Sequence, residues 1–167
     1  MVEALLATGR VMVGLTARSI ARLDADVTLP QFRTLVALAH GPRRTTDLAA
    51  DLGITPSTVT RTCDRLVRRE LVRRFRREED RRASWIALTE AGKTLIGSVM
   101  RQRRAEVDRL ARAANLRSPS TVASALGAFV AAAGELPEAE WWQRWESCAS
   151  TDPAGGAPRL AERLNIT

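Results

Sequence analysis

The chain has 167 residues, is 45% hydrophobic and carries a net charge of +7 at pH 7, a size and composition that suit one folded domain. No run approaches the roughly 18 apolar residues of a membrane span, and the beginning lacks the pattern of a signal peptide, so we expect a cytoplasmic protein that avoids membranes. Two cysteines outside any metal-ligand spacing and one histidine predict no metal, no cofactor and no enzymatic activity.

The first part of the chain predicts two helices. Residues 2–25 contain scattered apolar positions and no proline, and the apolar surface is broad enough to need a partner, so residues 1–27 are expected to form a dimerisation helix. Thr28 and Pro30 then begin a helix that is expected to reach about His40, before Gly41-Pro42 ends it.

Two short helices separated by a tight turn are predicted next. Thr45 or Thr46 is expected to cap the first, and Gly53 supplies the left-handed residue that ends it. Thr55-Pro56 then begins a helix with proline in its first position, where the missing N–H is harmless. This arrangement is a helix-turn-helix, with a recognition helix over about residues 55–69 whose inward positions are Val59, Cys63, Leu66 and Val67.

A basic β-hairpin is predicted directly after the recognition helix. The segments LVRRFR and SWIAL have alternating β-branched or aromatic positions, and the charged tip RREEDRRA separates them. We therefore expect a wing over about residues 71–88, within a winged helix-turn-helix domain over residues 28–90. The predicted fold class is mainly α, with this small hairpin and with the DNA-binding domain embedded in a helical dimerisation domain.

Arginines concentrate where this domain would meet DNA. Between Arg61 and Arg82 the sequence has ten arginines and five acidic residues, which gives +5 of the total +7. Hydroxyls and the helix N-terminus bind phosphate, and arginine pairs with guanine in the major groove. A merely solvated basic face is the alternative, and the adjoining caps, turn and hairpin argue against it. The expected DNA contacts are Thr45, Thr55, Pro56, Ser57, Thr58, Thr60, Arg61, Arg65, Arg68, Arg74, Arg76 and Arg77.

The stretch Asp80-Arg81-Arg82, followed after five residues by Leu88-Thr89-Glu90-Ala91-Gly92, resembles the wing and the start of the long helix in the MarR family of bacterial regulators. The resemblance covers roughly residues 5–133. It implies that Arg82 enters the minor groove and that Asp80 pairs with an arginine to hold the wing; an ordinary surface salt bridge is the alternative. Glu70 stands where the family commonly has glycine, and a positive φ there would cost roughly 1 kcal/mol.

The C-terminal part is expected to complete a dimer. Residues 91–147 hold a long helix with a heptad seam, defined here as Ile96, Met100, Arg103, Val107, Leu110 and Ala114. The resemblance implies a homodimer whose recognition helices lie about one DNA turn apart and read a pseudo-palindromic operator in duplex DNA. Trp141, Trp142 and Trp145 are expected to pack over the second subunit, with stacking on a ligand or base as the alternative. Residues 148–167 are expected to form a loose tail.

The resemblance also implies an effector site in a crevice between the dimer region and the DNA-binding lobe, for a small aromatic or phenolic molecule. The expected lining residues are Met12, Leu15, Phe32, Val36, His40 and Arg103. The alternatives are that no physiological ligand exists, that Arg103 is a snorkelling or salt-bridged residue, and that His40 caps a helix dipole.

Together these features predict a sequence-specific homodimeric repressor that a small effector releases from DNA. Two other functions stay open. Arginine density alone would suffice for a nonspecific architectural DNA-binding protein. Cys63, expected to act as a small hydrophobe, would instead make a redox-sensing repressor if it were partly exposed beside Arg61 and Arg65.

Overall fold

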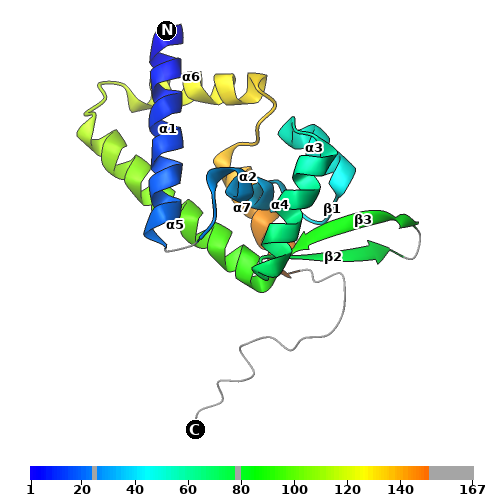
Figure 1. The fold of residues 1–167 in the computed structure, drawn as a ribbon. Coiled ribbons are helices and arrows are strands. Elements are labelled where there is room, and N and C mark those ends of the chain that lie inside the picture. Colours follow the sequence, from blue (N-terminus) through cyan, green and yellow to red (C-terminus); the bar gives the residue numbers. More distant parts are fainter. Residues whose placement is uncertain (24–25, 78–79, 151–167) are drawn as a thin grey trace.

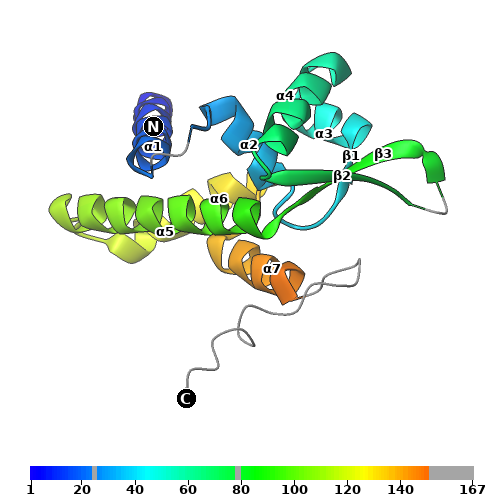
Figure 2. The same cartoon turned by 60° about the horizontal axis from the view of Figure 1, so that its bottom comes forward.

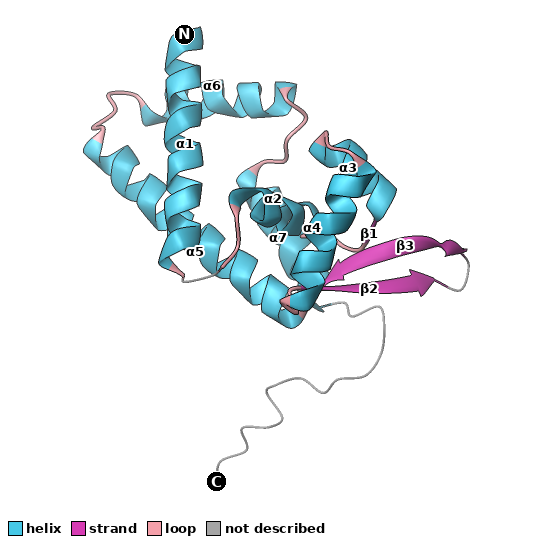
Figure 3. Ribbon diagram, viewed as in Figure 1, coloured by secondary structure: helices cyan, strands magenta, loops and turns pink. Residues whose placement is uncertain are grey.

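The computed structural model describes residues 1–23, 26–77 and 80–150. These are mostly helical with one small antiparallel sheet, which confirms the predicted fold class (Figure 3). The elements in chain order are α1 (Val2–Arg22), α2 (Leu29–Ala37), β1 (Arg43–Arg44), α3 (Thr45–Leu52), α4 (Pro56–Arg68), β2 (Val72–Arg77), β3 (Asp80–Leu88), α5 (Glu90–Ala113), α6 (Pro119–Ala132) and α7 (Glu138–Ser150).

The elements divide into two regions joined by α5. Helices α1 and α6 lie with the C-terminal half of α5 on one side of the molecule, and α2, α3, α4 and the sheet lie on the other (Figure 1). The hairpin of β2 and β3 projects away from the helices, and α7 lies on the face of α5 opposite to α1 (Figure 2). The long helix therefore connects a helical region to a winged helix-turn-helix.

Local chemistry determines where α2 begins and ends. Thr28 and Gln31 form a capping box, in which the Gln31 side chain accepts from the Thr28 N–H at 2.9 Å and the Thr28 hydroxyl accepts from the Gln31 N–H at 3.4 Å. The helix ends at Ala37, and the chain turns through Leu38 to His40. The expectation that the helix reaches His40 was wrong because this turn, and not Gly41-Pro42, ends it.

A third strand completes the sheet of the wing. Arg43 and Arg44 form β1, which pairs with Ile86 and Trp85 of β3, so the strand order is β1-β3-β2. Thr45 or Thr46 was predicted as the cap of α3, and Thr45 also as a DNA contact. Arg44 occupies the cap position instead of either threonine, and the Thr45 hydroxyl donates to the Ser84 carbonyl oxygen at 3.2 Å, while its DNA contact stays a prediction. Thr45 thus fastens α3 to the sheet.

The core lies where α2, α3, α4, α5 and the sheet meet, around side chains such as Leu35, Leu48 and Ile86. Trp141 and Trp145 of α7 belong to the same core, with 6% and 9% of their surface exposed. Their rings stack at 5.7 Å with an interplanar angle of 10°. The expectation that Trp141 and Trp145 pack over a second subunit was therefore wrong, because α7 folds back onto the winged domain of its own chain. Residues 148–150 continue α7 instead of beginning a loose tail, and residues 151–167 lie outside the described residues.

The heptad seam of α5 is divided between two environments. Ile96 and Met100 are buried in the chain's own core, whereas Leu110 is 46% exposed. The prediction of one continuous intersubunit seam was thus wrong for its first half. Glu106, outside the seam, is 5% exposed and makes an ion pair with Arg22, so the contact between α1 and α5 includes a buried charge.

A tight junction joins the recognition helix to α5. Glu70, directly after α4, has a φ of 57°, so the turn requires the left-handed conformation that glycine adopts most easily. The Leu71 carbonyl oxygen accepts from the Thr89 N–H at 3.1 Å, and the Thr89 hydroxyl donates to the Glu70 carbonyl oxygen at 2.5 Å. A Cβ on Gly92 would lie 2.1 Å from that Leu71 oxygen. The Leu88–Gly92 motif therefore holds the end of α4 close to the start of α5 through these contacts.

Candidate nucleic-acid interface

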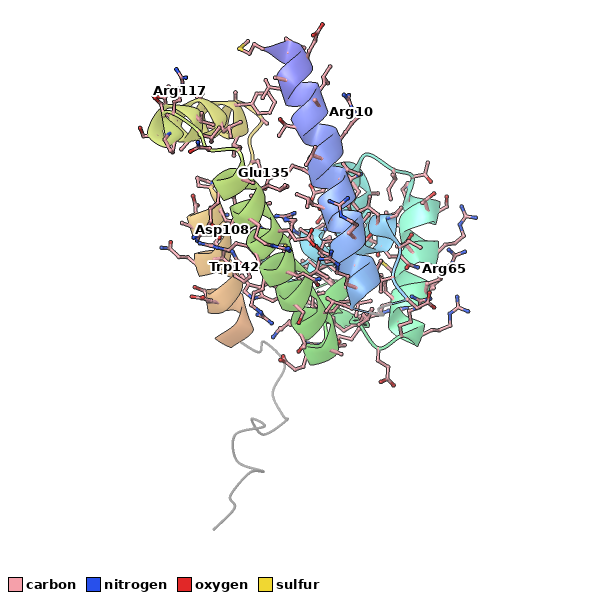
Figure 4. All side chains as sticks on the ribbon, turned by 90° about the vertical axis from the view of Figure 1, so that its left-hand side faces the viewer. Arg10, Arg65, Asp108, Arg117, Glu135 and Trp142 are labelled. Atoms are coloured by element: carbon pink, nitrogen blue, oxygen red, sulfur yellow. The ribbon has the colours of Figure 1, made fainter. Side chains whose placement is uncertain are left out.

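The recognition helix α4 has one buried face and one charged face. The Thr55 hydroxyl accepts from the Thr58 N–H at 3.3 Å, which is the predicted N-cap, and Pro56 follows in the first helical position. Val59, Cys63 and Leu66 have no exposed surface, but the expected inward Val67 is 37% exposed. Arg61, Arg65 and Arg68 are exposed on the remaining face, and Figure 4 shows Arg65 projecting outward from α4.

The hydroxyls at the start of α4 already make contacts within the helix. Thr55 lies 3.1 Å from the Ser57 hydroxyl and 2.9 Å from the Thr58 hydroxyl, and Thr60 donates to the Pro56 carbonyl oxygen at 2.9 Å. Because the Thr60 hydroxyl donates its proton to Pro56, its exposed oxygen can only accept a hydrogen bond. An acceptor suits a base amino group better than a phosphate. The structure thus distinguishes Thr60 from the arginines, which only donate.

Arg74 connects the wing to the recognition helix. Its guanidinium donates to an Asp64 carboxylate oxygen at 2.8 Å, and both side chains are partly exposed. Pairs of this kind contribute at most about 1 kcal/mol, but they orient both side chains. Of the arginines expected to contact DNA from β2, Arg74 is ion-paired, Arg76 is exposed and Arg77 lies against an aromatic ring.

Aromatic side chains and two further arginines of the sheet, Arg44 and Arg73, were not among the predicted site residues. Trp85 on β3 has the guanidinium carbon of Arg77 3.8 Å from its ring centroid and that of Arg44 at 5.3 Å. Arg73 lies 5.0 Å from the ring centroid of Phe75 in the same way. The alternation of side chains along β2 and β3 was the signal that could have revealed these residues. It could not show that β1 pairs with β3 at Trp85.

The side chains of Asp80 and Arg82 lie outside the described residues. The backbone of Asp80 begins β3 and pairs with Arg77 of β2, so both positions belong to the wing. Their predicted roles, a wing ion pair and a minor-groove contact, stay predictions.

Cys63 lacks the properties of a redox-active thiol. It is fully buried on the inner face of α4. Burial raises the pKa of the thiol to about 11, and the nearby charge of Arg74 only partly opposes that effect. Since the thiolate is the reactive form, the structure favours Cys63 as a small core residue and disfavours the redox-sensing alternative.

A cavity of about 510 Å³ lies between α1, α2, the α6–α7 connection and the winged domain, within the size range of small-molecule sites. It is lined by Met12, Phe32, Val36, His40 and Arg103 of the predicted set. Leu15 was wrongly expected in this set: it is buried and does not line the cavity. The prediction missed Arg33, Arg43 and the segment Gly134–Leu136, together with Trp141, since these reach the cavity only through tertiary folding.

His40 and Trp141 form part of the cavity wall. Their ring centroids lie 5.5 Å apart in an edge-on arrangement. Burial lowers the pKa of His40, and a hydrogen bond to the backbone of Trp141 partly opposes the shift. The buried Nε2 finds no hydrogen-bond partner among the described residues. The expectation of a helix-capping histidine was wrong because α2 ends three residues earlier.

Other kinds of site are not supported by the described residues. No group of three or more histidine, cysteine, aspartate or glutamate side chains within them is arranged to hold a metal ion. None of the helices in the same residues has the length and apolar character needed to cross a membrane.

The capped recognition helix, its arginines and the projecting hairpin define a winged helix-turn-helix protein. The model of the MarR family matches residues 27–84. The chain is 36% identical over 75 residues to the uncharacterized HTH-type transcriptional regulator YpoP of Bacillus subtilis, and 35% identical over 74 residues to YfiV of the same organism. Each match covers 44% of this chain, and the chain spans about half the length of these relatives, 53% and 46%.

Solved structures extend the similarity beyond the winged domain. RV1404 from Mycobacterium tuberculosis is 39% identical with a TM-score of 0.76, over 82% of this chain and 94% of that one. Apo MarR from E. coli has a TM-score of 0.66 over 78% of this chain and 95% of that one; at 18% identity it shows the shared fold alone. This chain belongs to the MarR family. Members of that family are transcriptional regulators and not enzymes, in agreement with the sequence analysis.

Proposed function

We propose that this protein is a homodimeric, sequence-specific transcriptional regulator that acts in the cytoplasm as a repressor and leaves its operator when a small molecule binds. The exposed arginines of α4, directly followed by the projecting wing, are the observation that carries the proposal. Such a face supplies phosphate contacts for affinity, while the start of α4 offers the hydroxyl and arginine groups that read base edges.

DNA binding is tested by fluorescence anisotropy on the DNA upstream of the protein's own gene and on a scrambled duplex, at near-physiological salt. We expect a preference of about a thousandfold or more for the upstream DNA. Arg65→Ala and Arg82→Ala are expected to weaken binding, because they remove a recognition-helix and a wing contact. Arg112→Ala is the matched control, since this α5 arginine is exposed and paired with Asp108 away from the winged domain.

Each outcome of that assay decides between functions. Tight binding to the upstream DNA that Arg112→Ala leaves intact supports the specific regulator. Equal binding to both duplexes favours a nonspecific architectural protein. Binding to neither duplex refutes the proposal, and the arginines are then merely a solvated surface.

Dimerisation is supported by an uncovered apolar surface on α1 and α6. Leu6 and Val13 of α1 are 60% and 56% exposed, and Phe129 of α6 is 54% exposed. Large exposed apolar patches mark interfaces, and α6 is rich in apolar residues and carries no charged one, yet has no buried residue. A second copy of the chain is the partner that would cover this surface and place two recognition helices on one operator.

The oligomeric state tests this surface directly. Sedimentation analysis should give a dimer for the wild type and a monomer for Phe129→Glu, because a buried unpaired charge is costly at an interface. Ile54→Glu, which adds the same charge at an exposed apolar position of the winged domain, should stay dimeric. A monomeric wild type would contradict the proposed dimer.

The cavity supports an aromatic or phenolic effector. Phe32 and Trp141 provide aromatic surface, and Arg33 and Arg103 provide positive charge for a phenolate or carboxylate. Titration with a panel of phenols and benzoates should change tryptophan fluorescence, since Trp141 lines the cavity, and should release operator DNA. Val36→Trp fills the cavity and should abolish that response while operator binding persists. A panel that neither binds nor releases DNA would count against this class of effector.

A further inference from the structure

An ion pair in the wall of the cavity joins the wing sheet to the helix-turn-helix. A guanidinium nitrogen of Arg43, in β1, lies 3.3 Å from a carboxylate oxygen of Asp51, in α3, and both residues line the cavity. Strand β1 and helix α3 lie side by side at this end of the winged domain (Figure 1). Each of the two side chains is 45% exposed, so a molecule bound in the cavity can compete for either of them.

The register of β1 explains why Arg43, and not the arginine that follows it, lies on the side of α3. Arg43 is directly opposite Ile86 of β3, whereas Arg44 is opposite Trp85. Residues directly opposite each other in an antiparallel pair share one face of the sheet. Ile86 has no exposed surface and belongs to the core, so Arg43 lies on the inner face of the sheet, which α3 covers.

Asp51 stands where a carboxylate is unfavourable for its own helix. It lies in the last turn of α3, which ends at Leu52, and the C-terminal end of a helix dipole repels negative charge. Arg43 offsets that repulsion and links this end of α3 to β1. At the start of α3, the Thr45 hydroxyl links the helix to β3 through the Ser84 carbonyl oxygen. The ion pair therefore helps to set the angle between the sheet of the wing and the helix-turn-helix.

We propose that an aromatic carboxylate in the cavity binds Arg43 in place of Asp51, and thereby separates β1 from α3 and lowers the affinity for DNA. This exchange presupposes the proposed effector site and DNA binding, and it names the residue through which the effector acts. A guanidinium pairs with a carboxylate in a bidentate way, so the ligand can replace the contact that Asp51 makes. Arg33 and Arg103 line the same cavity and add positive charge for the same anion.

The strength of the ion pair limits how much it can transmit. A ligand shifts an equilibrium only by the difference between its affinities for the two states. An exposed ion pair is worth little, so the exchange accounts for about a three- to fivefold loss of DNA affinity.

Asp51→Asn tests the exchange. The ligand is the benzoate of the effector panel that binds most tightly, measured by tryptophan fluorescence, and binding of the upstream DNA is measured by anisotropy. Without ligand, Asp51→Asn should weaken DNA binding about three- to fivefold, because the link between β1 and α3 is lost. It should tighten benzoate binding by about the same factor, since no carboxylate has to be displaced, and benzoate should then lower DNA affinity by a correspondingly smaller factor. A variant whose cavity is merely damaged would bind benzoate more weakly.

Two further comparisons isolate the charges that take part. The primary amide of the same benzoate has no charge with which to displace Asp51, so it should change the DNA affinity of the wild type by less than about twofold. Arg43→Gln should weaken benzoate binding about fivefold or more, because the cation is gone. Asp108→Asn is the matched control, since it removes a carboxylate from an exposed ion pair with Arg112 on α5, and it should change neither binding reaction.

Circular dichroism and thermal unfolding show whether each variant stays folded. Asp51→Asn removes a charge that the helix dipole disfavours, so α3 itself should not be weakened. Unchanged or weaker benzoate binding by Asp51→Asn, or equal DNA release by the amide and the benzoate, would overturn the exchange and leave the regulator intact. A wild type that binds the upstream DNA but no benzoate would overturn the exchange together with the carboxylate effector. A wild type that does not bind the DNA would overturn the proposed function as well.

Discussion

Replacing Gly92 with alanine tests whether the junction between the recognition helix and α5 depends on a close backbone approach. Gly92 lies in the first turn of α5, where its N–H donates to the Thr89 hydroxyl at 3.1 Å. An alanine Cβ there would stand 2.1 Å from the Leu71 carbonyl oxygen, a distance that real contacts do not reach. The backbone of Leu71, of residue 92 or of both therefore has to move.

Two opposing effects determine the size of the change. Overpacking costs about 1–3 kcal/mol, and displacing Leu71 also weakens its hydrogen bond from the Thr89 N–H, worth about 1 kcal/mol. Alanine in a helix recovers about 1 kcal/mol relative to glycine. We therefore expect Gly92→Ala to lower the free energy of unfolding by about 1–3 kcal/mol.

Chemical denaturation at a fixed protein concentration measures this change, because the stability of an oligomer depends on concentration. Gly97→Ala is the matched control on the same helix. Its Cβ would meet the end of the Arg101 side chain at 3.1 Å, which can move aside, so this variant should be neutral or slightly more stable. If Gly92→Ala were as stable as the wild type, the junction would tolerate a Cβ and the reasoning would be wrong.

Other predictions concern individual side chains. Glu70→Gly should raise the free energy of unfolding by up to about 1 kcal/mol in denaturation experiments, because glycine adopts a φ of 57° without a Cβ clash, and a loss of stability would contradict this. In a Cys148→Ser background, a thiol reagent at pH 7.5 should modify Cys63 only at the rate of unfolding, since burial raises its pKa to about 11; rapid modification would revive the redox alternative. Burial lowers the pKa of His40 below 6.5, so the unfolded chain binds more protons and stability should fall as the pH drops below about 6.5. That dependence should weaken in His40→Gln, and an identical pH profile would exclude His40 as its source.

Elements with local signals could be predicted from the sequence. The Thr55 cap follows from a side chain that satisfies a backbone group three residues away, and it is present. The wing followed from strand alternation and its basic tip. The left-handed conformation at Glu70 was predicted only conditionally, since a departure from glycine does not by itself show which φ the turn requires.

Features that depend on distant contacts could not be predicted in this way. The two residues of β1 are too short for any periodicity, so neither their pairing with β3 nor the bond from Thr45 to Ser84 was visible. The seam of α5 has the correct period for a helix partner, but the period does not tell which partner covers Ile96. Leu15 was expected to line the cavity and is buried instead, and Trp141 was expected over a second subunit but packs in its own chain's core beside the cavity. Each side chain is apolar, and only the fold decides what it faces.

The place of α7 in the core has a consequence for how the protein is made. Trp141 and Trp145 belong to the core of a winged domain whose other parts end at Leu88 and in the first half of α5. During synthesis the earlier helices emerge well before α7, and until it docks they expose apolar surface that it will cover. The DNA-binding domain therefore completes its folding only after nearly 60 residues beyond the wing have been added, and until then its exposed apolar surface is prone to aggregation.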